Sequence, residues 1–214
     1  MESSSLMHAL LSTQTPLLPA PGVARVYLSL GWGLVLAWVA IWLAQGRAMP
    51  AWLRHWLPLA LLLLCLLPGP ASPAYWLGLA FRAPSVLLTL LAASAVLRHY
   101  RPQAAWPVPL GPLRPWALVP VLWGWALLLD TFALWPVSLY ALGFAPLTLA
   151  VLVLLGLLPW LLRGAGSASM LLTAALVCYV GLRLPSGNVW DALLDPWLWL
   201  LLQLDWLRSK RRRA

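Results

Sequence analysis

The last thirty residues, PSGNVWDALLDPWLWLLLQLDWLRSKRRRA (Pro185–Ala214), determine how the rest of the chain is interpreted. Most of this stretch is apolar, it contains four tryptophans, and it ends in a basic run. The basic run consists of Arg208, Lys210, Arg211, Arg212 and Arg213. Basic residues directly after an apolar segment mark the cytoplasmic side of a membrane span, and they are attracted to anionic lipid headgroups. The stretch therefore predicts a transmembrane segment with a cytoplasmic C-terminus whose basic tail contacts the lipid bilayer.

The composition of the whole chain extends this interpretation to a multi-spanning protein. The 214 residues are 63% hydrophobic and 9% charged, whereas a soluble domain has about 45–50% apolar and about 25% charged residues. A water-facing fold of this size cannot bury so much apolar surface, so lipid is the expected solvent. We predict an all-α, polytopic transmembrane helical bundle that forms one domain, residues 26–207. An N-terminal arm, residues 1–25, is expected to be partly disordered or interfacial, and residues 208–214 are expected to form the basic cytoplasmic tail.

Apolar runs separated by prolines and arginines divide the bundle into spans. The first run, from about Val26 to Gln45, has 20 residues without a charge. A helix of that length is about 30 Å long, which is the thickness of the hydrocarbon core of a bilayer. The final segment spans only with a kink at Pro196, because residues 196–207 alone are about 18 Å long. The other spans are expected at 51–67, 84–97 with an interfacial piece at 74–82, 116–135, 137–162 with bends at Gly143 and Pro146, and 169–182.

The distribution of basic residues predicts the orientation of the bundle. With about seven spans and a cytoplasmic C-terminus, the N-terminus is outside. Of the 14 Lys and Arg residues, all but Arg25, Arg82 and Arg183 then fall on the cytoplasmic side, as the positive-inside rule requires. Six spans are the alternative, in which 51–67 and 84–97 form one re-entrant hairpin, but that arrangement moves basic residues to the outside.

Five charged residues form a candidate polar cluster, namely Arg82, Asp130, Arg183, Asp191 and Asp195. Acidic residues in membrane spans are costly and are candidate functional residues by default. In the seven-span arrangement these residues fall on the outer side, so we expect them to meet there. Two interpretations stay open. The cluster is either a site for a ligand, an ion or a proton, or a structural arrangement in which Asp130 neutralises Arg82 or Arg183.

Two of the aspartates also fit the pattern of helix caps. Asn188 followed three residues later by Asp191 resembles a capping box, with Asn188 as the N-cap. Asp195 before Pro196 resembles a second N-cap, with proline at the first helical position. Asp205 lies beside the basic tail and is expected to be a surface partner of Arg208.

The chain lacks the residue patterns of common catalytic, metal and cofactor sites. His8, His55 and His99 are scattered, and Cys65 and Cys178 lie in separate apolar runs. The sequence contains no P-loop, no glycine-rich dinucleotide motif and no nucleophile motif. We therefore predict no metal, no cofactor and no catalytic residue. Since the basic tail is a topology signal, we also predict no nucleic-acid partner.

These patterns favour a non-catalytic, tryptophan-rich membrane protein. We expect a subunit or accessory protein of a bacterial inner-membrane assembly, which binds a membrane-protein partner or forms a homo-oligomer. The bacterial origin is inferred from the high content of Leu, Ala, Trp, Pro and Arg, which is typical of a GC-rich genome. The first alternative is a small transporter or channel that uses the outward-facing Asp/Arg cluster. The second is an enzyme that acts on lipid-linked substrates.

Overall fold

The chain is all-α wherever its structure is described. The computed structural model describes residues 10–13, 17–45, 49–102, 118–134, 136, 138–163 and 167–211. These residues form nine α-helices and two 3₁₀ turns and contain no β-strand. The all-α prediction is therefore confirmed for this part of the chain.

The N-terminal half folds around one long helix. Helix α2 (Pro21–Ala44) packs along α3 (Ala51–Cys65) and along α5 (Val86–Tyr100). Between α3 and α5 the chain forms a 3₁₀ turn, η1 (Gly69–Ala71), and the short helix α4 (Pro73–Phe81), which also contacts α2.

The C-terminal half is a second group of helices. Helix α8 packs against α7 and α9, and α10 packs against α6. Helix α5 joins the two halves, since it contacts α2 as well as α8 and α9. The elements of this half are α6 (Leu118–Thr131), η3 (Ala141–Phe144), α7 (Pro146–Arg163), α8 (Ser167–Leu182), α9 (Val189–Leu193) and α10 (Pro196–Arg211).

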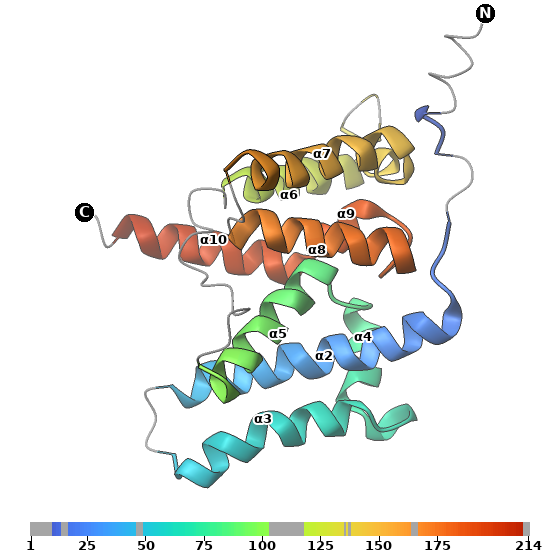
Figure 1. Cartoon of the computed structure of the whole chain (residues 1–214). Helices are drawn as coiled ribbons and strands as arrows, with labels where there is room; N and C mark the ends of the chain where they lie inside the picture. Colours follow the sequence, from blue (N-terminus) through green and yellow to red (C-terminus); the bar gives the residue numbers. More distant parts are fainter. Residues whose placement is uncertain are drawn as a thin grey trace, which may run out of the picture.

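The long helices lie roughly side by side and alternate in direction. In Figure 1, α3, α6 and α8 run from left to right, whereas α2, α5, α7 and α10 run from right to left. The bundle has a C-terminal end, which holds the last residues of α10 and the start of α3, and an α9 end, which holds α9 and the start of α2. The first residues of α5 and α10 lie partway along the bundle, so each of these helices covers only part of its length (Figure 1).

Two apolar cores hold the helices together. One core is centred on α2 and α5 and includes Trp32 and Leu88. The other lies between α5, α8 and α9 and includes Leu176 and Val189. Gly33 permits the close packing of α2 on α3, because a Cβ at this position would overlap side-chain atoms of α3. The two cores meet at α5, which therefore connects the halves.

Helix α2 is the only described helix that is long and apolar enough to cross a membrane by itself. Its 24 residues correspond to a length of about 36 Å. Helices α3, α5, α6, α8 and α10 have 14 to 16 residues, or about 21–24 Å. The expected runs are shortened because prolines and capping residues interrupt them.

Several element boundaries differ from the sequence prediction, among them the end of α6 at Thr131 and the following three. Helix α2 begins at Pro21, which fits a first helical position, so Arg25 belongs to the helix and not to the arm. Helix α5 begins after its N-cap, Ser85, and not at Pro84. The fifth expected span is not one bent helix but η3 followed by α7. Pro146 begins α7 because proline has no N–H to continue a preceding turn.

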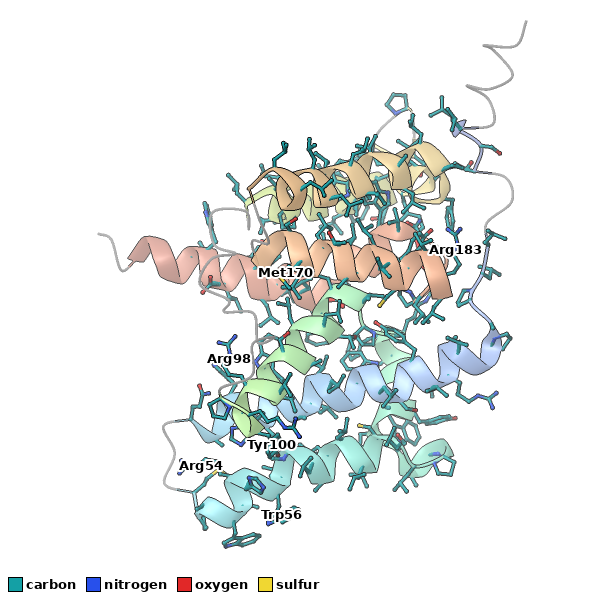
Figure 2. All side chains as sticks on the ribbon, viewed as in Figure 1. Arg54, Trp56, Arg98, Tyr100, Met170 and Arg183 are labelled. Carbon is teal, nitrogen blue, oxygen red and sulfur yellow. The ribbon has the colours of Figure 1, made fainter. Side chains whose placement is uncertain are left out.

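Four of the described arginines lie at the two ends of the bundle. Figure 2 shows Arg54 and Arg98 at the C-terminal end and Arg183 at the α9 end. Arg25 lies in the first turns of α2 and therefore at the α9 end (Figure 1). Residues outside the described part include Arg47, Arg114, Arg212 and Arg213, together with Trp116 and Trp135, the expected limits of the fourth span.

Candidate functional site

Two turns of the chain share the pattern Arg-X-Pro-Ser. The first turn, Arg82–Ser85, comes directly after α4, and the second turn, Arg183–Ser186, comes directly after α8. Both arginines have a positive φ angle, 61° at Arg82 and 56° at Arg183. Each arginine N–H still closes its helix, at 3.0 Å from a carbonyl of α4 and at 2.7 Å from a carbonyl of α8. The two turns therefore leave their helices in similar ways.

The first turn meets the start of α10 at the carboxylate of Asp195. The Ser85 N–H donates to Asp195 Oδ2 at 2.5 Å, and the Leu198 N–H donates to Asp195 Oδ1 at 2.7 Å. Ser85 itself caps α5, because its Oγ accepts from the Leu88 N–H at 3.1 Å. The N-termini of α5 and α10 thus face one carboxylate, and the positive ends of both helix dipoles favour its negative charge. Asp195 takes the N-cap position that the sequence suggests.

Two side chains of α2 fix the first turn in place. The Tyr27 hydroxyl donates to the Pro84 carbonyl at 2.8 Å and lies 3.0 Å from Thr89 Oγ1. The Trp32 Nε1–H donates to the Arg82 carbonyl at 2.8 Å. Each bond satisfies a carbonyl that has left the helical pattern, so α2 supports the unusual backbone of the turn.

The second turn belongs to a hydrogen-bonded group at the α9 end, which we call the α9 network. Asp191 Oδ2 accepts from the Tyr140 hydroxyl at 2.8 Å and from the Ser186 hydroxyl at 2.5 Å. Asp130 Oδ2 accepts from the Tyr140 N–H at 2.8 Å and from the Ser138 hydroxyl at 3.0 Å. The network therefore ties the end of α6 to α9 through Tyr140. Its members are Asp130, Ser138, Tyr140, Ser186, Asn188 and Asp191.

Asn188 is the fully buried centre of the α9 network. Its Oδ1 accepts from the Trp190 N–H at 2.9 Å and so caps α9, while its Nδ2 donates to the Tyr140 carbonyl at 2.9 Å. Gly143 makes room for it, because a Cβ there would overlap Asn188 Oδ1. The expected capping box is not formed. The Asn188 N–H donates to Ser186 Oγ at 3.3 Å, since Asp191 is occupied by the two hydroxyls.

The structure brings only part of the predicted polar cluster together. Asp130 and Asp191 share the α9 network, whereas Asp195 belongs to the separate contact with the first turn. In the described part of the chain, Arg82 and Arg183 form no ion pair with these three aspartates, so the expected neutralisation of Asp130 by arginine is wrong. Arg82 is exposed, and the Arg183 guanidinium lies 5.3 Å from the centre of the Tyr179 ring.

Sequence reasoning missed the residues that actually connect these aspartates. Tyr140, Ser186 and Ser85 are the partners of Asp130, Asp191 and Asp195. The repeated Arg-X-Pro-Ser pattern was the available signal for the two serines, because it marks two helix ends with the same chemistry. The basic tail is described only in part: Arg208, Lys210 and Arg211 lie in the last turns of α10, and Arg212 and Arg213 lie outside the described residues.

The electrostatics of the α9 network favour a neutral tyrosine. Burial raises the pKa of the Tyr140 phenol well above its usual value, and the Asp191 carboxylate that accepts its hydrogen bond raises it further. The charge of Arg82 acts in the opposite direction on this pKa. Tyr140 is therefore a hydrogen-bond donor that keeps its proton, and it holds Asp191 in place.

The polar side chains of the α9 network bond to one another and to nearby backbone groups. The Ser186 hydroxyl bonds a carboxylate without a histidine or lysine that would take its proton during nucleophilic attack. Among the residues described, His, Cys, Asp and Glu side chains nowhere form a group of three that would hold a metal ion. Searches for similar proteins found no matching family model, no matching curated protein and no matching solved structure.

Proposed function

We propose that the chain is a non-catalytic component of a bacterial inner-membrane assembly, with about seven spans, an outer N-terminus and a cytoplasmic C-terminus. The observation that carries this proposal is the apolar outer surface of the bundle. On α7, Leu154, Leu161 and Leu162 are 62%, 71% and 72% exposed. Large apolar side chains are also exposed on α2, α3, α6 and α10. Surfaces of this kind mark contact with a membrane or with a protein partner.

The interrupted helices support the seven-span arrangement. Helices α4 and α5 have 9 and 15 residues, and α9 and α10 have 5 and 16 residues. Placed end to end, the helices of each pair would be about 31–36 Å long, against a bilayer core of about 30 Å. We count α2, α3, α6, α7 and α8 as the other five passes, although α3, α6 and α8 are shorter than the bilayer core, and the directions of the long helices alternate in Figure 1.

The α9 network supports a structural role over a catalytic one. Its carboxylates are used by the Tyr140 and Ser186 hydroxyls and by the backbone of the segment before η3. An apolar surface around an internally satisfied polar network suits a protein that packs against another membrane protein or a second copy of itself.

The assembly is tested with the full-length chain, tagged and expressed at its natural level in its native host. Extraction in a mild detergent followed by native mass spectrometry should give one complex of fixed stoichiometry, with a membrane-protein partner or with further copies of the chain. A monomer that carries only lipid would overturn the proposal.

The topology is tested separately by a reporter fused after Pro50, which should be cytoplasmic, and a periplasmic reporter would contradict the seven-span arrangement.

The meeting of α5 and α10 favours a second candidate function, a small transporter. Both helices begin partway along the bundle, and their N-termini face Asp195. Secondary transporters build ion and substrate sites from discontinuous helices of this kind. In this candidate, Asp195 is the one member of the predicted Asp/Arg cluster that binds the ion or proton. Reconstituted wild-type protein should dissipate an imposed proton gradient, Asp195→Asn should not, and Asp205→Asn should behave as wild type. Inserted wild-type protein without any flux would remove this candidate.

A further inference from the structure

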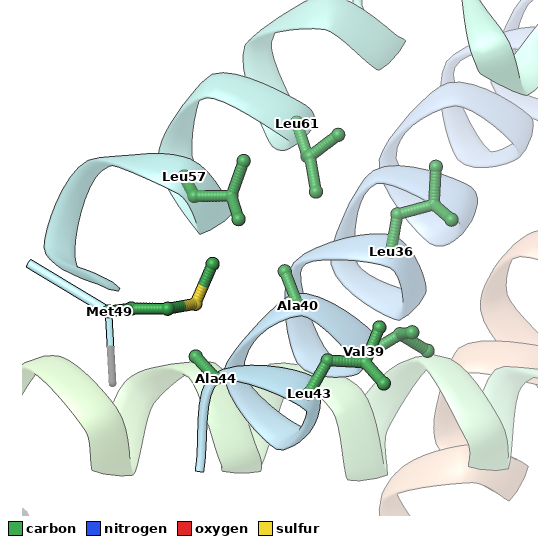
Figure 3. Close-up of a pocket in the computed structure, with 8 residues that line it drawn as sticks. All are labelled: Leu36, Val39, Ala40, Leu43, Ala44, Met49, Leu57 and Leu61. Atoms are coloured by element: carbon green, nitrogen blue, oxygen red, sulfur yellow. The ribbon is translucent and has the colours of Figure 1, made fainter. Parts of the chain in front are cut away.

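An apolar groove lies between α2 and α3 near the C-terminal end of the bundle. Its volume is about 240 Å³, and every lining side chain is aliphatic or a methionine. Figure 3 shows the side chains of α2 and α3 facing each other across this groove, with Met49 at one end. The lining residues on α2 are Leu36, Val39, Ala40, Leu43 and Ala44, and those on the α3 side are Met49, Leu57 and Leu61.

The positively charged side chain of Arg54 lies at the end of the groove that Met49 lines. The Arg54 guanidinium donates from one nitrogen to the Met49 carbonyl at 3.3 Å, and the Arg54 side chain is exposed. A guanidinium has five N–H donors, so most of them face away from this bond. Trp52 and Trp56, on the same turns of α3, are 65% and 59% exposed. Exposed tryptophans beside an arginine are typical of the level of lipid headgroups.

The surrounding structure holds this end of the groove together. The Tyr100 hydroxyl at the end of α5 donates to the His55 carbonyl at 2.6 Å, and the two rings pack edge to face at 5.0 Å. Figure 2 shows Arg54, Trp56, Arg98 and Tyr100 gathered at this end of the bundle. The groove is therefore bordered by a fixed contact between α3 and α5 and by positive charge.

We propose that this groove binds one acyl chain of an anionic glycerophospholipid, whose phosphate lies on the free face of Arg54. The proposal rests on the membrane location of the proposed function. The lining consists only of Leu, Val, Ala and Met side chains, which offer no polar group to an occupant, so it suits an acyl chain, which is wholly apolar. The phosphate supplies a negatively charged partner for the exposed Arg54 guanidinium. Two phosphate oxygens can accept from it in the bidentate geometry that a guanidinium favours.

The test measures how much lipid the isolated full-length chain retains. This measurement needs no protein partner. The chain is released from nanodiscs that contain equal amounts of phosphatidylglycerol and phosphatidylcholine, and native mass spectrometry counts the bound lipids. We expect preferential retention of phosphatidylglycerol. Arg54→Gln should reduce this preference about fivefold, as expected for about 1 kcal/mol per basic residue near a lipid surface. The matched control Arg25→Gln, at the α9 end, should keep the preference.

A second pair of variants tests the groove itself. Val39→Trp places a large side chain in the groove from a position that is 41% exposed and should abolish retention of both lipids. Val26→Trp, on the same helix but outside the groove and 59% exposed, should retain them. Equal retention of the two lipids by wild type, or no difference between Arg54→Gln and Arg25→Gln, would overturn the lipid site. Neither outcome affects the assembly proposal, whereas absence of the chain from the membrane fraction would remove both.

Discussion

The two Arg-X-Pro-Ser turns share a positive φ angle at the arginine, differ at the X-Pro bond, which is cis only between Leu184 and Pro185, and end in different hydrogen bonds. In the first turn, Ser85 is followed at once by α5, so its hydroxyl caps that helix and its N–H is left for Asp195. In the second turn, Gly187 and Asn188 come before α9, so Asn188 takes the cap and the Ser186 hydroxyl is left for Asp191. The presence of Gly187 and Asn188 before α9 thus goes with a change in the serine group that bonds to an aspartate, from the N–H of Ser85 to the hydroxyl of Ser186.

This difference also decides how far apart in the chain the bonded groups are. Ser85 and Asp195 are 110 residues apart and join the two halves of the bundle. Ser186 and Asp191 are five residues apart and order the chain locally. We therefore expect changes at the first turn to weaken the whole fold and changes at the second turn to loosen mainly the α9 end.

The largest effect is expected from Asp195→Ala. The substitution removes the N-cap of α10 and leaves the N–H of Ser85, a fully buried residue, without its acceptor. Loss of a cap costs about 0.5–2 kcal/mol and an unsatisfied buried donor about 1–3 kcal/mol, so the free energy of unfolding should fall by about 2–4 kcal/mol. Urea titration in detergent micelles, followed by the fluorescence of the 16 tryptophans, measures this change.

The variant Asp195→Asn separates the two contributions of this residue. An asparagine keeps one oxygen that can cap α10, but its amide nitrogen cannot accept from Ser85, so the loss should be intermediate. Ser186→Ala is the matched change in the second turn and should cost less than either variant. If Ser186→Ala were as costly as Asp195→Ala, the distinction between a long-range and a local turn would be wrong.

Asn188→Ala should give the next largest effect, confined to the α9 end. It removes the cap of α9 and leaves the Tyr140 carbonyl without its Nδ2 donor. The expected loss in unfolding free energy is about 1–3 kcal/mol. Hydrogen exchange followed by mass spectrometry should show faster exchange in α9 and in 138–145, with α2 and α5 almost unchanged. Equal acceleration in α2 would show that the second turn supports the whole fold.

The sequence predicted the local features of these turns better than the distant ones. The N-cap positions of Asn188 and Asp195 were predictable, because a cap depends on residue type and on the next few residues. The contact of Asp195 with Ser85 was not, because it depends on the packing of helices far apart in the chain. The same limit applies to Asp130, whose actual partners lie in the segment before η3 and not on an arginine.

The all-α fold was predictable from composition, whereas the lengths of the helices were not. An apolar run shows where a helix is compatible with lipid, but a cap or a proline within it decides where the helix stops. Ser85 and Pro146 each shorten or divide an expected span in this way. The number of spans therefore depends on how interrupted helices are paired, which hydropathy alone does not specify.

A smaller effect of opposite sign is expected from Arg82→Gly. The φ and ψ angles of Arg82 are 61° and −157°, a region that is almost exclusive to glycine and costs other residues about 1–3 kcal/mol. Glycine should therefore raise the unfolding free energy by about 1–2 kcal/mol, as measured by the same urea titration. Arg82→Ala keeps the Cβ and should show no such gain. Arg183→Gly is the parallel test in the second turn, and a loss of stability in both glycine variants would contradict the strain assigned to these turns.

The smallest effect is a change in pH dependence at the α9 network. Burial and Asp191 raise the pKa of Tyr140 above its usual value of 10.0, so the folded state keeps the phenolic proton after the unfolded state has lost it. This contribution to stability is complete below about pH 10 and is lost as the pH rises through the pKa of the folded state. At about pH 10.5 the loss should reach about 0.8 kcal/mol.

Tyr140→Phe isolates this contribution within the second turn. The variant loses the hydrogen bond to Asp191 at neutral pH, at a cost of about 0.5–1.5 kcal/mol, but its unfolding free energy should fall less steeply above pH 10 than that of wild type. Asp191→Asn keeps an acceptor for the phenol and removes the negative charge, so its slope should lie between the two. Urea titrations from pH 8 to pH 11 measure the three slopes. Parallel curves for wild type and Tyr140→Phe would show that Tyr140 ionises alike in the folded and unfolded states, and the α9 network would then not hold its phenol neutral.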